Sequence, residues 1–351
     1  MRENYDVAII GAGPAGAVFA KELSRKAPGL QVLLVDGQDE SSKKVCGGLL
    51  APDAQEMFAR LNLTLPTDIL ADPQIFDVET IDLEKKCVRN YQRHYLNMDR
   101  YAFDKWLVSL IPERVDVVQG RCVRLCREAD GFLLKLGEKT VKARFLVGAD
   151  GAGSLVRRTF FKDKPMKYVA LQQHFACKNP ALPPYSCIFD PETSDSCSWT
   201  IRKEDVIIFG GAFHKKNCRA AFEKQKQRLE EYLGLSFGTP IKTEACLVTS
   251  PRKWRDFNVG RDDVFLVGEA AGFISASSFE GISSALLSAR LLAEAFGASQ
   301  DGAKILRCYA QSTKKLKLKL YTKIQKRKVL CSPFLRFLVM KSGIQSMKKY
   351  T

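Results

Sequence analysis

The sequence of 351 residues lacks several features that mark common classes of protein. It contains no apolar run of about 18 residues, so we expect no helix that crosses a membrane. A strand-like segment begins within the first few residues, and we therefore expect no signal peptide. Only three histidines and no Cys-x-x-Cys pair are present, which argues against a metal site. Without a secretory signal, the eleven cysteines are expected to be reduced thiols of a cytoplasmic protein.

Acidic residues are absent from the end of the chain. Residues 304–351 contain fourteen Lys or Arg and no Asp or Glu, and they carry most of the net charge of +16. We predict that this segment binds an anionic membrane surface, on the inner face of the membrane, because solvated helices normally mix both signs of charge. The alternative is a helix packed on the rest of the protein. Nucleic acid is not an expected partner, since no aromatic pattern for reading bases accompanies the cations.

A glycine motif near the N-terminus organises the sequence. An apolar run at 5–10 leads into Gly11, Gly13 and Gly16, spaced as Gly-x-Gly-x-x-Gly, and an amphipathic helix follows. A second apolar run ends at Asp36, 20 residues after the last glycine. This β-α-β unit is typical of dinucleotide binding, because the glycines let a pyrophosphate approach the helix start while the acid binds the adenosine ribose. The motif alone leaves NAD and FAD open.

Two further junctions between a strand and a turn carry an acid beside glycine. Asp150 follows the apolar segment 145–148, and Glu269 follows the segment 263–267. We interpret both carboxylates as acceptors for sugar-like hydroxyl groups. A helix is predicted to begin at Gly281 and Ile282, whose free N–H groups are suited to the electronegative atoms of a flavin ring.

Together these motifs resemble the FAD-dependent oxidoreductases that share the para-hydroxybenzoate hydroxylase fold. Within that class, the segments 44–48 and 97–107 are similar to the geranylgeranyl reductase family. The segments 46–55, 185–190 and 268–278 resemble the bacterial CbrA family of FAD oxidoreductases, and this resemblance extends over nearly the whole chain. The resemblance implies that the cofactor is FAD.

The same resemblance implies roles for individual residues. Ala15 and the three glycines would contact the FAD pyrophosphate, Asp36 the adenosine ribose, and the backbone of Val123 the adenine. Arg100 would contact the region between the ribityl chain and the phosphates. The remaining predicted contacts are made near the isoalloxazine ring and ribityl chain by Cys46, Gly47, Gly48, Glu269, Gly281 and Ile282. Asp150 is kept as a hydroxyl acceptor from the pattern of its junction.

The sequence pattern and the resemblance predict an α/β fold, with a Rossmann-like FAD-binding domain, an antiparallel-sheet substrate domain and a helical C-terminal tail. Alternating apolar residues at 75–95 and 167–213 predict the antiparallel sheet. The predicted domains are a discontinuous FAD-binding domain at 1–75, 97–166 and 255–300, a substrate-binding sheet domain at 76–96 and 167–254, and a basic helical region at 301–351.

The predicted function is hydride transfer from reduced flavin to a C=C bond of an isoprenoid or other lipid-like substrate. No second Gly-x-Gly-x-x-Gly motif is present, so NAD(P)H or a protein electron donor is expected to act as a transient reductant. Two alternatives stay open: a flavin-dependent monooxygenase acting on an apolar substrate, and a non-catalytic flavoprotein at the membrane surface that acts as a redox sensor or scaffold.

Four residues are candidates for the substrate side of the site. Cys46 is a candidate catalytic thiol, although a small residue that merely fits beside the ring explains it as well. His174 is a candidate proton donor, with a hydrogen-bonded structural histidine as the alternative. Trp199 and Lys203 are candidates for lining the substrate pocket, and the alternative for Trp199 is a place in the core.

Overall fold

The computed structural model describes residues 1–37, 44–177 and 182–349. The chain divides into two compact units. The first unit comprises Met1–Lys44, Tyr101–Met166 and Thr249–Thr322, and the second comprises Val45–Arg100, Lys167–Val248 and Lys323–Thr351. These boundaries differ from the predicted domains, because residues 45–75 belong to the second unit and the basic tail is divided between the two.

The first unit is built on a sheet that has eight strands among the described residues. Its main path runs β15 (Gly260–Arg261), β16 (Val264–Leu266), β9 (Lys139–Gly148), β1 (Asn4–Ile10), β2 (Val32–Asp36) and β6 (Asp116–Gln119). The pairings from β16 to β6 are parallel. β8 (Gly131–Leu136) extends the sheet through antiparallel pairing with β9, and β7 (Cys122–Glu128) pairs antiparallel with β8. Buried parallel strands of this kind need helices on their faces.

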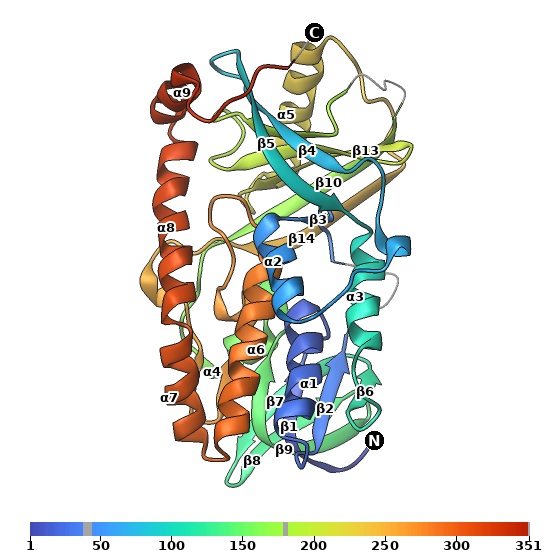
Figure 1. Ribbon diagram of the computed structural model, residues 1–351, viewed down its shortest axis with the longest axis vertical. Helices are drawn as coiled ribbons and strands as arrows, with labels where there is room; N and C mark the ends of the chain where they lie inside the picture. The colour runs from blue at the N-terminus through green and yellow to red at the C-terminus, as the bar shows by residue number, and fades with distance from the viewer. Residues whose placement is uncertain (38–43, 178–181, 350–351) are drawn as a thin grey trace. The chain divides into compact units, whose positions relative to one another are not determined.

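Helices cover this sheet as the Rossmann-like pattern predicts. Figure 1 shows α1 (Pro14–Lys26) beside α6 (Ile282–Ala298), and Phe19 meets Phe296 there with ring centroids 5.8 Å apart. α7 (Gly302–Ser312) is fixed by Tyr309, whose hydroxyl donates to the Leu266 carbonyl oxygen at 3.0 Å. Two shorter helices complete this part of the fold, α3 (Arg100–Ser109) and α4 (Leu155–Phe160).

The second unit contains another sheet with eight described strands. The strand order is β14 (Lys242–Thr249), β10 (Lys167–Ala176), β13 (Val206–Phe213), β12 (Cys197–Lys203), β11 (Tyr185–Phe189), β4 (Ile75–Asp82), β5 (Cys87–Asn97) and β3 (Leu49–Leu50). Its register is antiparallel except between β4 and β11, which run parallel. The short strand β3 pairs with β5, and this pairing places the segment after Lys44 in the second unit.

One face of the second sheet packs against α5 (Cys218–Leu233). The packing is aromatic, and its buried rings are those of Phe175, Phe209, Phe213, Phe222 and Phe237. Two other helices of the unit are α2 (Pro52–Arg60) and α9 (Pro333–Ser342). Because side chains alternate along each strand, the residues between these phenylalanines point to the opposite face of the sheet.

The basic tail is helical, as α7, α8 (Lys314–Cys331) and α9. The apolar stripe along α7 and α8 is buried, and its members are Ile305, Tyr309, Leu316, Leu320 and Ile324. This stripe is therefore part of the protein core. Residues 350 and 351 of the tail lie outside the described residues. Among the helices of the described chain, none is both long enough and apolar enough to cross a membrane.

Candidate cofactor and substrate sites

Four strands of the first unit, β1, β2, β9 and β16, end within one residue of the same level of its sheet. Ile10 at the end of β1 pairs with Val35 of β2 and with Gly148 of β9, and Gly148 also pairs with Leu266 of β16. The turns that follow β1, β9 and β16 therefore meet at one carboxyl edge. In open parallel sheets this edge is where ligands bind.

The glycine loop after β1 fits closely against the turn after β9. Gly11 has φ of 103°, which favours glycine, and a Cβ there would lie 2.7 Å from the Ala149 carbonyl oxygen. A Cβ at Gly16 would lie only 1.8 Å from the Gly11 carbonyl oxygen. Two of the three glycines are thus explained by packing of the protein itself.

Gly13 has a different environment. A Cβ built on Gly13 would meet nothing within 4 Å, so its missing side chain leaves open space at the start of α1. The N-cap has no side-chain hydrogen bond, and the first turn of α1 carries no acid. A helix start with uncapped N–H groups beside open space suits an anionic group such as a pyrophosphate.

Asp36 lies buried at the end of β2, where the sequence motif predicts a ribose contact. Its side chain is only 6% exposed, and Lys105 Nζ lies 3.3 Å from its Oδ2 atom. The neighbouring segment is fixed by Gly120, whose N–H donates to the Asp36 carbonyl oxygen at 2.8 Å. Val123 falls three residues later, at a shift in the register between β7 and β8. The predicted ribose and adenine contacts therefore share one end of the site.

Asp150 has one carboxylate oxygen with partners and one without. Its Oδ2 accepts from the N–H groups of Leu155 at 2.6 Å and Val156 at 3.3 Å. Its Oδ1 is buried and has no partner among the described residues. Burial raises the pKa of Asp150 above its ordinary value, against these hydrogen bonds. An unpartnered buried acceptor of this kind suits a ligand hydroxyl.

Glu269 is held by protein groups on both oxygens. Its Oε1 accepts from the Thr249 N–H at 2.8 Å, and its Oε2 lies 3.1 Å from Lys44 Nζ. The preceding Gly268 approaches the glycine loop, since a Cβ there would lie 2.8 Å from the Ala15 Cβ. The turn after β16 therefore touches the loop after β1. The sequence motif singled out Glu269 and the family resemblance implied Ala15, but neither gave a role to the Lys44 cation.

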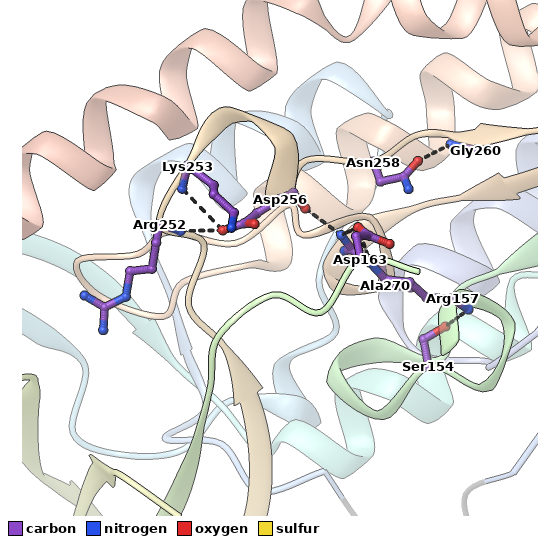
Figure 2. Close-up of polar contacts among 9 residues, drawn as sticks. All are labelled: Ser154, Arg157, Asp163, Arg252, Lys253, Asp256, Asn258, Gly260 and Ala270. Atoms are coloured by element: carbon purple, nitrogen blue, oxygen red, sulfur yellow. Dashed lines mark hydrogen bonds and ion pairs between the residues drawn. The ribbon is translucent and has the colours of Figure 1, made fainter. Parts of the chain in front are cut away.

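Arg157, on the helix α4 that follows β9, contacts the turn that follows β16 (Figure 2). This buried guanidinium donates to the carbonyl oxygens of Ala270 at 2.9 Å and Asp256 at 2.8 Å, and it forms an ion pair with Asp163. Ser154 caps α4 by accepting from the Arg157 N–H at 2.9 Å. The position of the turn at 268–271 is thus fixed from α4.

The start of α6 resembles the start of α1. Gly281 is its N-cap, no side chain caps the helix, and the first turn from Ile282 onward carries no acid. α6 has 17 residues, so the positive end of a long helix lies at the residues predicted to meet the pyrimidine edge. These features of the first unit, with Gly13 and Asp150, fit a dinucleotide cofactor.

In the second unit, the predicted ring contacts lie on a loop held by Lys203. The Gly48 N–H donates to Cys46 Sγ at 3.3 Å, and a Cβ at Gly47 would lie 2.4 Å from Ile201. Lys203 Nζ donates to the carbonyl oxygens of Gly48 at 3.3 Å and Met98 at 2.6 Å.

Lys203 also hydrogen-bonds to the side chain of the buried Asn97. Burial lowers the pKa of Lys203 to about 8. Three acceptors match the three N–H groups of an ammonium. Lys203, predicted to line a substrate pocket, therefore clamps the loop at 46–48 to the segment before Arg100, which is the first residue of α3.

The sheet face opposite α5 carries a row of polar side chains. Gln172 and Trp199 both pair with Gly210, and a Cβ at Gly210 would lie 2.6 Å from Trp199 Nε1. The buried Trp199 Nε1 and Gln172 Oε1 atoms have no partner among the described residues. His174 lies two residues along the same strand face as Gln172.

Glu244 joins this row and was not predicted. Its Oε2 lies 3.0 Å from His174 Nε2 and accepts from Gln172 Nε2 at 3.0 Å. Burial lowers the pKa of His174, and Lys242 and Lys203 act in the same direction, while Glu244 opposes them. The row thus brings together a titratable imidazole and two buried polar atoms that have no partner among the described residues.

Comparison with known proteins identifies the family. A family model described as Lycopene cyclase protein matches residues 6–178. Protein CbrA of Escherichia coli O9:H4 (strain HS) is 47% identical over 352 residues, covering 97% of this chain and 94% of that protein. The chain belongs to the CbrA family. Protein CbrA of Shigella dysenteriae serotype 1 is also 47% identical and covers 97% of this chain and 98% of its own length. The resemblance to CbrA that the motifs predicted is confirmed.

Solved structures share the fold of this CbrA-family chain. A geranylgeranyl bacteriochlorophyll reductase-like protein from Thermoplasma acidophilum has a TM-score of 0.81 at 18% identity, covering 96% of this chain and 91% of its own. PqsL, a probable FAD-dependent monooxygenase from Pseudomonas aeruginosa, has a TM-score of 0.70 at 17% identity, and the match covers 97% of this chain and 100% of PqsL. The predicted fold class, that of the FAD-dependent oxidoreductases, is confirmed, with one parallel pair in the second sheet.

Proposed function

We propose that this CbrA-family protein is an FAD-dependent oxidoreductase that reduces a C=C bond of an isoprenoid or other lipid-like substrate. The observation that carries FAD binding is the carboxyl edge of the first sheet, where open space at Gly13 and the unpartnered Oδ1 of Asp150 lie on adjacent turns. When bound, FAD would supply the hydride. NAD(P)H or a protein donor would supply the electrons in turn.

The residues of the first unit would bind and orient the cofactor. Gly13 and the uncapped start of α1 would receive the pyrophosphate, and Asp36 the adenosine ribose. Asp150 Oδ1 would accept a hydrogen bond from a hydroxyl group of the cofactor. The start of α6 would place positive partial charge against the pyrimidine edge of the ring.

The polar sheet face of the second unit would serve the substrate. Saturation of a C=C bond adds a hydride to one carbon and a proton to the other, so the protein must hold a proton donor. His174 is our candidate, since its imidazole is hydrogen-bonded to Glu244 and imidazole is a common proton donor in enzymes. Cys46 is the second candidate. Trp199 contributes a large apolar ring to the sheet face that carries His174, which suits a hydrocarbon chain.

The lipid-like substrate is supported by the names of similar proteins. The geranylgeranyl group in the name of one structural neighbour and the lycopene in the name of the matching family model are both unsaturated isoprenoids. We also propose that residues 304–351 attach the protein to an anionic membrane surface, where such a substrate would be found. Of their fourteen cations, Arg327 and Arg336 are buried in ion pairs with Asp195 and Asp82. The other twelve, together with the lack of acids, support this part of the proposal.

Anaerobic reoxidation of the reduced holoprotein tests the proposed reaction. The protein is photoreduced without oxygen and mixed with a lipid extract rich in unsaturated isoprenoids, and flavin absorbance is followed. The matched control is the same extract after chemical hydrogenation, which removes its C=C bonds. We expect reoxidation by the first extract and none by the second.

Other outcomes would replace the proposal with one of its alternatives. Reoxidation only on admission of oxygen, with oxygenated lipid as product, would identify a monooxygenase. If the lipid does not reoxidise the flavin, and oxygen reoxidises it without forming oxygenated lipid, a non-catalytic flavoprotein is favoured. Purified protein that binds no FAD at all would overturn the cofactor assignment itself.

A further inference from the structure

Helix α9 presents an apolar face to solvent at the end of the basic tail. Its exposed residues are Phe334 at 67%, Leu335 at 41%, Leu338 at 46% and Val339 at 40% relative exposure. At 100° per residue these positions span a single arc of the helix. Single exposed apolar residues are common on proteins, but four large ones on one helical face mark an interaction surface.

The opposite face of α9 is anchored to the second sheet. Arg336 is buried, donates from Nε to Asp82 Oδ2 at 2.8 Å and stacks 4.8 Å from the Phe189 ring centroid. Arg89 Nε donates to the Met340 carbonyl oxygen at 2.8 Å. These contacts prevent α9 from turning its apolar face inward. Phe334 and its neighbours are therefore held outward by the fold.

We propose that α9 is the element of this protein that enters the lipid, with the side chains of Phe334, Leu335, Leu338 and Val339 inserted among the acyl chains. The inference rests on the proposed membrane attachment and assigns it to one helix. The apolar stripe of α7 and α8 cannot fill this role, because it is buried in the protein. Ile344 at 69% exposure extends the apolar surface beyond the helix.

Charge complementarity selects an anionic membrane as the occupant. Lys341 at the end of α9 and Lys348 shortly after it are exposed, and no acid occurs anywhere from residue 304 onward. Apolar residues on one face with neighbouring lysines are the composition of helices that lie in an anionic lipid interface. A second copy of the chain would bring two cationic tails together, and this like-charge contact disfavours self-association.

Vesicle flotation with matched variants tests the inference. The full-length holoprotein is mixed with vesicles of phosphatidylcholine alone or with phosphatidylglycerol added. We expect the wild type to float only with phosphatidylglycerol. The double variant Phe334→Ser/Leu338→Ser should lose at least tenfold in binding. The control Leu318→Ser, which removes an exposed leucine from α8, should bind as the wild type does.

A spectroscopic variant reports insertion directly. Phe334→Trp places an indole on the apolar face of α9, and we expect its emission to shift to the blue and to be quenched by brominated acyl chains in anionic vesicles. Wild-type protein, with its three tryptophans, supplies the background. Circular dichroism of each variant checks that the fold is retained.

Failure of this inference is distinct from failure of membrane attachment. If the wild type does not float with anionic vesicles, attachment itself is wrong. If the wild type floats but the double variant floats equally, or vesicles leave the emission of the Phe334→Trp variant unchanged, α9 does not insert. A double variant that loses a dimer in light scattering, with unchanged flotation, would assign the apolar face to a second copy and overturn the inference.

Discussion

The Arg157 guanidinium donates a hydrogen bond to the Ala270 carbonyl oxygen at 2.9 Å (Figure 2). Helix α4, which follows β9, therefore holds the turn that follows β16. The same side chain donates to the Asp256 carbonyl oxygen at 2.8 Å and pairs with Asp163. Glu269 lies next to Ala270 in the held turn. Arg157 thus fixes the turn that carries Glu269 at the carboxyl edge of the first sheet, and a site held in place by the protein limits the entropy lost on binding.

Replacement of Arg157 by Met should loosen this turn. The variant leaves two carbonyl oxygens and the Asp163 carboxylate without their donor, so we expect the free energy of unfolding to fall by about 3 kcal/mol. Urea denaturation measures the change. The control is Arg158→Met on the exposed side of the same helix, for which we expect about 0.5 kcal/mol. Equal effects of the two variants would contradict the role given to Arg157.

Replacement of Gly13 by Ala should separate cofactor binding from folding. Gly13 has φ of −66° and its added Cβ meets nothing within 4 Å, so the fold should accept alanine with a stability change within about 0.5 kcal/mol. The same methyl group occupies the space assigned to the pyrophosphate. We therefore expect FAD affinity, measured by fluorescence titration of the apoprotein, to fall at least tenfold.

Gly29→Ala is the control for this experiment, because its added Cβ also meets nothing within 4 Å. It should leave both stability and FAD affinity unchanged. An unaltered affinity in Gly13→Ala would place the cofactor elsewhere. A large loss of stability in that variant would mean that Gly13 serves packing, as Gly11 and Gly16 do.

Local sequence patterns predicted the elements of the fold well. The β-α-β unit at the N-terminus was readable because apolar periodicity changes from strand to helix at the glycine motif. The parallel pairing of β4 with β11 could not be read from the sequence, because the two strands are about a hundred residues apart. Parallel and antiparallel pairing both fit the same alternation of apolar and polar residues. The predicted boundary at residue 75 differs from the observed one near Lys44 because β3 is only two residues long.

The partners of the predicted site residues were harder to foresee. Glu269 stood out in its motif, but its contacts with Lys44 and Thr249 come from distant parts of the chain that only the tertiary structure brings together. Glu244 beside His174 is a similar case. Lys203 was expected to face a substrate, and the structure instead surrounds its ammonium with protein acceptors. A lysine on a strand gives no sequence signal for such burial.

Stability above neutral pH should reveal the buried Lys203. Burial lowers its pKa to about 8 from the ordinary 10.5, so between these values the unfolded chain binds a proton that the folded protein lacks. Stability therefore rises with pH across this window, by up to the order of 3 kcal/mol, and the gain is lost as pH falls through 8. Urea denaturation from pH 7.5 to 10 measures the slope.

Lys203→Met supplies the reference for that slope, since all other titrating groups are shared. As the pH rises from about 8 to 10.5, the free energy of unfolding of the wild type should increase relative to that of the variant. A difference that is independent of pH would contradict the lowered pKa. Flavin absorbance of both proteins would show whether the loop at 46–48 depends on the clamp.

Replacement of His174 by Gln tests the proposed proton donor. We expect the rate of reoxidation by the lipid substrate, measured by anaerobic stopped flow, to fall about 100-fold, with FAD affinity unchanged. An unchanged rate would transfer the role to Cys46, and Cys46→Ser would then show the loss.

The pH dependence of the rate gives a second readout for His174. If protonated His174 donates the proton, the rate of the wild type decreases as pH rises through the pKa of His174, which burial holds below its ordinary value. Glu244 raises that pKa, because its carboxylate lies 3.0 Å from Nε2 and favours the charged imidazole. Glu244→Gln should therefore move the decrease to lower pH while leaving the rate at acidic pH nearly intact. A pH profile that is the same in both proteins would mean that His174 does not carry the proton.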